Sequence, residues 1–289
     1  MIEWYYLVII SAILSVIVSI IQKGALKVEH ATQYSAASSF LVAISSLVFL
    51  PFASSVITPL QLLLTVAFGL LSATTLLLGT KVMRHGNISS VTPLSNVLPI
   101  LFTIIFAYIF LAEQLTLIQG FCVIGIVAVT YFLLFRKRRN QLRKDFDSNK
   151  YKTMLVANAF VGSIGGIIAK YLLVGMNVFS FMIITQIVAA LCLAAFITLK
   201  YDGVRGIEWT VKRYSWSFAA IVLLIIALRV IGYFALTVAP VNLANTLSNA
   251  VFVMLTVPIG GLIFREGGLK RKIVLSSAIL LFAYILIVQ

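Results

Sequence analysis

The chain has 289 residues, of which 62% are hydrophobic and only 10% are charged. This composition excludes a soluble globular domain and indicates a protein that crosses a membrane several times. The formal net charge of +14 would suggest a nucleic-acid partner in a soluble chain, but in a membrane protein its meaning depends on where the basic residues lie.

Ten apolar stretches have roughly the 20 residues that a helix needs to cross the hydrocarbon. In chain order they are Trp4–Gln22, Tyr34–Ser54, Leu60–Thr80, Ile88–Leu111, Leu117–Phe135, Met154–Val174, Val178–Leu199, Tyr214–Leu236, Val241–Phe264 and Ile273–Val288. The polar, basic segment 136–152 separates a first unit, residues 1–135, from a second unit, residues 153–289. The sequence therefore predicts an all-α integral membrane protein with ten transmembrane helices, five in each unit.

The two units repeat one pattern of polar residues at an offset of 153 positions. Ser95, Asn96 and Glu113 of the first unit correspond in this way to Ser248, Asn249 and Glu266 of the second. Polar matches in so apolar a chain indicate a duplicated unit. Because each unit has an odd number of spans, the second copy must enter the membrane from the opposite side. We therefore predict two inverted five-helix repeats, the plan of many secondary transporters with a substrate site near the midplane.

Within each repeat, small polar residues advance by three or four positions and so share one helix face. Such a face should not meet lipid, because hydrocarbon offers no hydrogen-bond partners. The residues either hold neighbouring helices together or line a watered cavity, and the repetition of the whole face favours the cavity. The candidate substrate-binding residues on this face are Thr92, Ser95 and Asn96 in the first repeat and Asn245, Ser248 and Asn249 in the second.

The basic residues sort by membrane side. Of the 22, 20 lie in the connections that follow the odd-numbered spans, and the opposite connections and both termini carry none. The positive-inside rule then predicts that segment 136–152 is cytoplasmic and that both termini lie outside. Orientation and anionic lipid account for the basic runs, so the expected partners are the lipid bilayer and a small-molecule substrate, and no nucleic acid.

Two basic residues, Lys170 and Arg229, fall inside predicted spans. Lys170 is near the end of its span, and snorkelling to the interface is favoured over a role in the site. Arg229 lies about 22 Å into its span at 1.5 Å per residue, where a guanidinium requires an anion, backbone carbonyls or water. Arg229 is therefore a candidate substrate-facing cation, with capping of helix carbonyls as the alternative.

Chemical groups that would indicate other functions are missing from the predicted spans. All eight acidic residues lie in termini, connections or helix ends, which argues against a proton-coupled exporter of cationic drugs. Glu113 and Glu266 are expected to accept from the first amides of the helix that follows each of them. Cys122 and Cys192 are isolated in apolar runs and read as core residues. With no nucleophile–base pair, metal cluster or phosphate-binding motif, we expect no enzyme, cofactor or metal.

The fourth helix of each unit is a small-polar helix followed by Leu111-Ala112-Glu113 or Phe264-Arg265-Glu266. In these features the chain resembles a ten-helix EamA-type transporter of the drug/metabolite transporter superfamily. The resemblance implies a central cavity lined by helices one, three, four, six, eight and nine, and alternating access for small metabolites such as amino acids, often outward. Family members commonly keep both termini in the cytoplasm, whereas the charge distribution here predicts that they lie outside.

Three functions are compatible with these observations. The first is a secondary transporter of the cell membrane, an exporter of small polar metabolites that binds its substrate between Asn96 and Asn249, with an anionic group at Arg229. The second is an exporter of lipophilic drugs or lipid-linked molecules, which would need a side opening lined by aromatic residues. The third is a structural or partner-binding membrane protein with a dry, closed centre. A homodimer is compatible with each of them.

Overall fold

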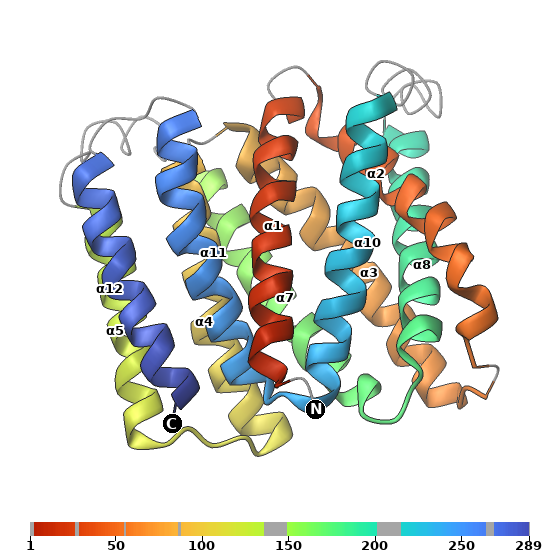
Figure 1. Ribbon diagram of the computed structural model, residues 1–289. Coiled ribbons are helices and arrows are strands. Elements are labelled where there is room, and N and C mark those ends of the chain that lie inside the picture. Colours follow the sequence, from red (N-terminus) through yellow and green to blue (C-terminus); the bar gives the residue numbers. More distant parts are fainter. Residues whose placement is uncertain are drawn as a thin grey trace.

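The computed structural model describes residues 3–26, 29–54, 56–85, 88–135, 149–200, 215–263 and 269–288, and these residues form ten α-helices with no strand among them (Figure 1). The helices are α1 (Trp4–Leu26), α2 (Ala31–Ser46), α3 (Pro59–His85), α4 (Ile88–Leu111), α5 (Leu117–Phe135), α7 (Asn149–Leu173), α8 (Val178–Lys200), α10 (Ser215–Val238), α11 (Val241–Ile263) and α12 (Leu269–Val288). The predicted all-α fold with ten helices is thereby confirmed, one helix for each apolar stretch.

Seven of the ten helices meet the length and hydropathy of a membrane span, and α4 and α5 contain the shorter apolar segments Leu98–Leu111 and Leu117–Phe132. The largest differences from the predicted bounds are at polar ends. Helix α7 begins at Asn149, inside the predicted linker, because a helix can continue beyond the hydrocarbon into polar residues. The second span is not one α-helix, because α2 ends at Ser46 and a 3₁₀ turn, η1 (Leu47–Phe52), continues it through Pro51.

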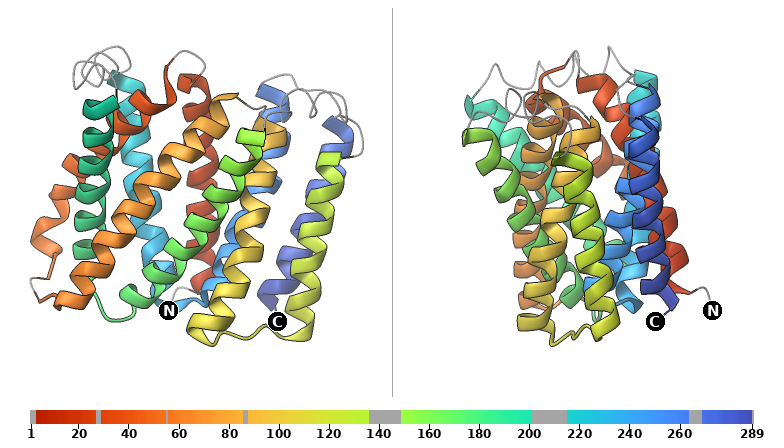
Figure 2. Two further views of the ribbon diagram at one scale, coloured as in Figure 1. Left: turned by 180° about the vertical axis from the view of Figure 1, so that it is seen from behind. Right: turned by 90° about the vertical axis from the view of Figure 1, so that its left-hand side faces the viewer.

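The helices pack in two layers, and each layer mixes helices from both halves of the chain (Figure 2). Neighbours in one layer follow the order α12, α11, α1, α10, α2, and neighbours in the other follow α5, α4, α7, α3, α8. Replacing every helix by its counterpart in the other half converts one order into the other. The packing therefore has the two-fold pseudosymmetry that an inverted duplication produces.

Both chain ends lie on one side of the molecule, here named the termini side (Figure 1). The opposite side, where α1, α3, α5, α8 and α11 end, is named the linker side.

The helices α5 and α12, at the outer edge of the two layers, pack very closely. A Cβ atom added at Gly125 of α5 would lie 2.6 Å from the Phe282 ring of α12, so a larger residue there requires this ring to move. Cys122 is buried one turn earlier and is a free thiol, in line with its expected place in the core.

Candidate functional site

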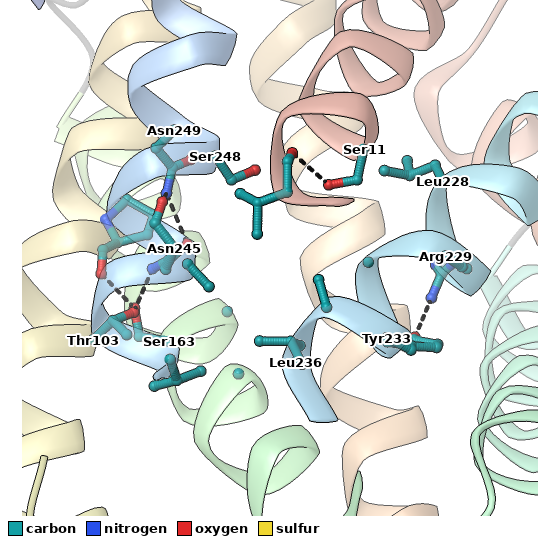
Figure 3. Close-up of a pocket in the computed structure, with 18 residues that line it drawn as sticks. Ser11, Thr103, Ser163, Leu228, Arg229, Tyr233, Leu236, Asn245, Ser248 and Asn249 are labelled. Carbon is teal, nitrogen blue, oxygen red and sulfur yellow. Dashed lines mark hydrogen bonds between the residues drawn. The ribbon is translucent and has the colours of Figure 1, made fainter. Parts of the chain in front are cut away.

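A cavity of about 390 Å³ lies between α1, α4, α7, α10 and α11 (Figure 3). Its lining residues lie at the ends of these helices nearer the termini side. Its lining residues are Val8, Ser11, Pro99, Thr103, Gly162, Ser163, Gly166, Leu228, Arg229, Gly232, Tyr233, Ala235, Leu236, Val241, Ala244, Asn245, Ser248 and Asn249. Among the described residues, α3 contributes none of this lining, contrary to the family expectation. The reason is that α7 packs between α3 and α4.

One wall of the cavity is a chain of amide hydrogen bonds on α11. The Asn249 Nδ2 donates to the backbone oxygen and to the Oδ1 of Asn245, both at 2.8 Å. The Asn245 Nδ2 donates in turn to the Thr103 hydroxyl of α4 at 2.7 Å. The two explanations for the polar face therefore both apply to Asn245, which connects two helices and also lines the cavity.

Two groups on this wall keep hydrogen-bonding capacity for a solute. Within the part of the chain that the structure describes, the Ser248 hydroxyl and the Asn249 Oδ1 have no hydrogen-bond partner, and both residues are only half-buried. Figure 3 shows Ser248 directed into the space between α11 and α1. A serine hydroxyl can donate and accept, and an amide oxygen can accept, so these groups can bind the polar end of a small molecule.

Arg229 lies on the opposite side of the cavity from Asn245 and Asn249 (Figure 3). Its Nη1 donates to the Tyr233 hydroxyl one helix turn away at 3.0 Å. This contact is with a side-chain hydroxyl and not with the helix carbonyls of the alternative interpretation. Among the described residues that line the cavity, Arg229 is the one that is formally charged. A guanidinium with free donors in a largely apolar cavity provides a binding group for a carboxylate.

The floor of the cavity is held by an acid and a base at the junction of α10 and α11. The Lys170 Nζ donates to the carbonyls of Leu236 and Ala239 at 2.8 Å, at the C-terminal end of α10. The Glu113 carboxylate accepts from the backbone amides of Val241 and Asn242 at 2.9 and 3.1 Å, at the N-terminal end of α11. Each charge thus binds the helix end of opposite partial charge.

These contacts add to one sequence expectation and correct another. The Lys170 ammonium lies near the ends of α7 and α10, where it satisfies carbonyls that the end of α10 leaves free. Glu113 caps α11 and not α5, the helix that follows it, because a left-handed turn at Ala112, with φ of 53°, redirects the chain. Glu266 lies outside the described residues, so the matching contact in the second repeat is not described.

A second lysine forms the same contact in the first repeat. The Lys23 Nζ, at the end of α1, donates to the carbonyls of Met83 and Arg84 at the end of α3. Lys23 and Lys170 stand 147 positions apart, each three residues before the end of its helix, α1 or α7, so they are counterparts in the two repeats, as are α3 and α10. The pair shows that the inverted pseudosymmetry extends to individual hydrogen bonds, one on the linker side and one on the termini side.

The candidate residues on the polar face have different positions in the structure. Asn245, Ser248, Asn249 and Arg229 line the main cavity. Asn96 lines a smaller adjoining cavity of about 220 Å³ together with Ser248 and Asn249. Ser95 is half-buried and is not among the lining residues of either cavity. The side chain of Thr92 lies outside the described residues.

The sequence analysis did not single out Tyr233 or the small residues of α1 and α7 as parts of the site. Tyr233 follows Arg229 by four positions, which is the spacing of contacting side chains on a helix, so a signal was present. Gly162 and Gly166 of α7 also line the cavity. A Cβ atom added at Gly166 would meet no atom within 4 Å, whereas one added at Gly162 would lie 3.7 Å from Thr75 of α3, so Gly166 leaves open space and Gly162 also permits helix packing.

Ten helices around an internal, partly polar cavity are an arrangement found among membrane transporters. Residues 2–135 match the model of the EamA-like transporter family. The match covers the first five-helix unit, and together with the all-α fold it supports an EamA-type protein of the drug/metabolite transporter superfamily.

Comparison with solved structures supports the same fold. A chain titled "Crystal structure of protein" is 15% identical, with a TM-score of 0.65 over 95% of this chain and 97% of its own length. At that identity the likeness shows the fold alone. A comparison with curated proteins gives no match.

Proposed function

We propose that this transporter moves small polar metabolites such as amino acids across the cell membrane by alternating access around the central cavity, and that net movement is outward. The observation that carries the proposal is the arrangement of the main cavity, with hydrogen-bonding groups of α11 on one side and Arg229 on the other. Its volume of about 390 Å³ falls within the range of about 300–1,000 Å³ typical of small-molecule sites.

The proposed solute carries an anionic group at one end. Its carboxylate would bind the Arg229 guanidinium, for which paired N–H donors provide a geometric match. Its other polar group would bind the Ser248 hydroxyl and the Asn249 amide oxygen. Unpaired polar groups in such a cavity cost about 1–3 kcal/mol each, so a solute that satisfies both ends is preferred over a purely apolar one.

The test is counterflow of radiolabelled amino acids, small organic acids and neutral polyols into proteoliposomes. Arg229→Leu should lower transport of carboxylate-bearing solutes about tenfold or more, which corresponds to a charged hydrogen bond of roughly 1.5–3 kcal/mol. Arg229→Lys should retain part of that transport. Leu223→Ala, a change at an exposed position of the same helix, serves as the matched control.

Three results would contradict the proposal in different ways. Equal transport of neutral and anionic solutes by Arg229→Leu would remove Arg229 from the site. Counterflow of lipophilic drugs alone would favour the second function class, and counterflow of no solute would favour a protein without transport.

The orientation is a separate proposal, in which the basic linker 136–152 is cytoplasmic. Labelling of Asn140→Cys from outside intact cells would refute that orientation.

A further inference from the structure

The central space consists of two compartments that share three residues. The smaller compartment of about 220 Å³ is lined by Ser15, Val18, Ser19, Asn96, Leu228, Ser248, Asn249 and Phe252. Leu228, Ser248 and Asn249 also line the main cavity. The boundary between the compartments therefore lies at these three side chains.

The order of residues along the helices shows that the compartments are stacked along the helix axes. On α1, the main cavity contacts Val8 and Ser11, and the smaller compartment contacts Ser15 and Ser19, further toward the linker side. On α4, Thr103 lines the main cavity, whereas Asn96, nearer the linker side, lines the smaller compartment. A solute crossing the membrane through both compartments must pass the level of the shared residues.

At that level the shared residues differ in chemistry. Ser248 and Asn249 are polar and come from α11, whereas Leu228 is apolar and comes from α10 on the other side of the space. Figure 3 shows Leu228 and Ser248 directed into the space from opposite sides, with Ser11 of α1 near the same level. An apolar side chain at a constriction excludes water and polar solutes until it moves.

We propose that Leu228 is the gate between the two compartments and that its size limits the solutes that pass. Leu228 has no hydrogen-bonding group, so it separates the compartments sterically and by excluding water. Arg229, the next residue along α10, binds the solute in the proposed function. A movement of α10 at Arg229 on solute binding would therefore also move Leu228. Only the transport arm of the test rests on the proposed function.

The first arm measures accessibility and needs no substrate. In protein lacking Cys122 and Cys192, single cysteines are introduced as Ser11→Cys in the main cavity or Ser15→Cys in the smaller compartment. A membrane-impermeant thiol reagent is added to either face of sealed vesicles. Each cysteine should react faster from its own face, the termini side for position 11 and the linker side for position 15. Leu228→Ala should raise the rate from the far face about tenfold.

Two controls separate gating from general loosening. Leu228→Met, which keeps the volume, and Leu223→Ala, on the exposed face of α10, should leave both rates unchanged. If Leu228→Ala does not give a monodisperse protein, Leu228→Phe replaces it and should lower the far-face rate. Equal labelling from both faces in protein with Leu228, or far-face rates unaffected by the alanine or phenylalanine change, would overturn the proposal.

The second arm compares solutes of increasing size in counterflow. Leu228→Ala should raise the transport of a bulky amino acid relative to a small one, and Leu228→Phe should lower it. An unchanged ratio would show that another residue limits solute size and would overturn that part of the proposal. If labelling follows the prediction but no solute is transported by the unmodified protein, the gate stands and the proposed function fails.

Discussion

Removal of the Glu113 carboxylate is the most direct test of how the cavity floor is held. Glu113→Ala deletes two hydrogen bonds, to the amides of Val241 and Asn242, and removes the negative charge at the start of α11. Loss of an N-terminal cap costs about 0.5–2 kcal/mol, and the interaction with the helix dipole adds about 0.3–1 kcal/mol. Because Glu113 is half-buried, we expect Glu113→Ala to lower the free energy of unfolding by about 2 kcal/mol in total.

This loss of stability in Glu113→Ala can be measured by thermal unfolding in a fixed detergent. Exposure of the buried Cys122 thiol to a reactive dye reports unfolding. At roughly 2–4 °C per kcal/mol for a chain of this size class, Glu113→Ala should lower the Tm by about 4–8 °C. Glu113→Gln, which retains an acceptor but not the charge, should lower it less.

Glu3→Ala is the matched control, because Glu3 is an exposed carboxylate on the same side of the molecule. A Tm shift for Glu113→Ala no larger than that of Glu3→Ala would refute the reasoning. A double variant with Lys170→Met tests the shared junction. Since both side chains hold the α10–α11 connection, their effects should not be additive.

Two further predictions concern packing and the cavity wall. Gly125→Ala should lower the free energy of unfolding by about 1–3 kcal/mol, because the added Cβ would overlap the Phe282 ring. Gly120→Ala is the control: no atom lies within 4 Å of its new Cβ, so it should be neutral or stabilising in the same unfolding assay. Thr103→Val should weaken solute binding and cost about 1–2 kcal/mol, because the Asn245 amide loses its acceptor; an unchanged Tm and unchanged counterflow would show that the contact has no role.

The parts of the structure that depend on local periodicity could be predicted from the sequence. Each apolar stretch became a helix, since a chain in lipid must satisfy its own backbone hydrogen bonds. The spacing of the polar residues on α4 and α11 also predicted that Asn96 and Asn249 share a space, and both line the smaller compartment. Ser248 lines both compartments, whereas its counterpart Ser95 lines neither, so the two repeats present different edges of their polar faces to the central space.

Contacts between distant helices could not be predicted from the sequence. The Lys170 ammonium donates to a carbonyl 66 positions later, and the Glu113 carboxylate accepts from an amide 128 positions later. No periodic pattern in the sequence indicates either pairing, because each pairing depends on how the helices of the two halves pack in the two layers. The general rules for charged groups at helix ends were correct, but the partner could be identified only once the packing was known.

The two lysine contacts also bear on how the duplicated halves diverged. In the first half the lysine lies 60 positions before its acceptor, Met83, and in the second half 66 positions before Leu236. The six additional residues lie after the start of α8, because Lys170 and Val178 stand 147 positions after their counterparts Lys23 and Ala31, whereas Leu236 stands 153 positions after Met83. The halves therefore differ in the number of residues between these helices, while each keeps a lysine near the end of the corresponding helix. The lysine contact does not depend on the number of residues between the lysine and its acceptor, so a short insertion between α8 and α10 should leave both contacts in place.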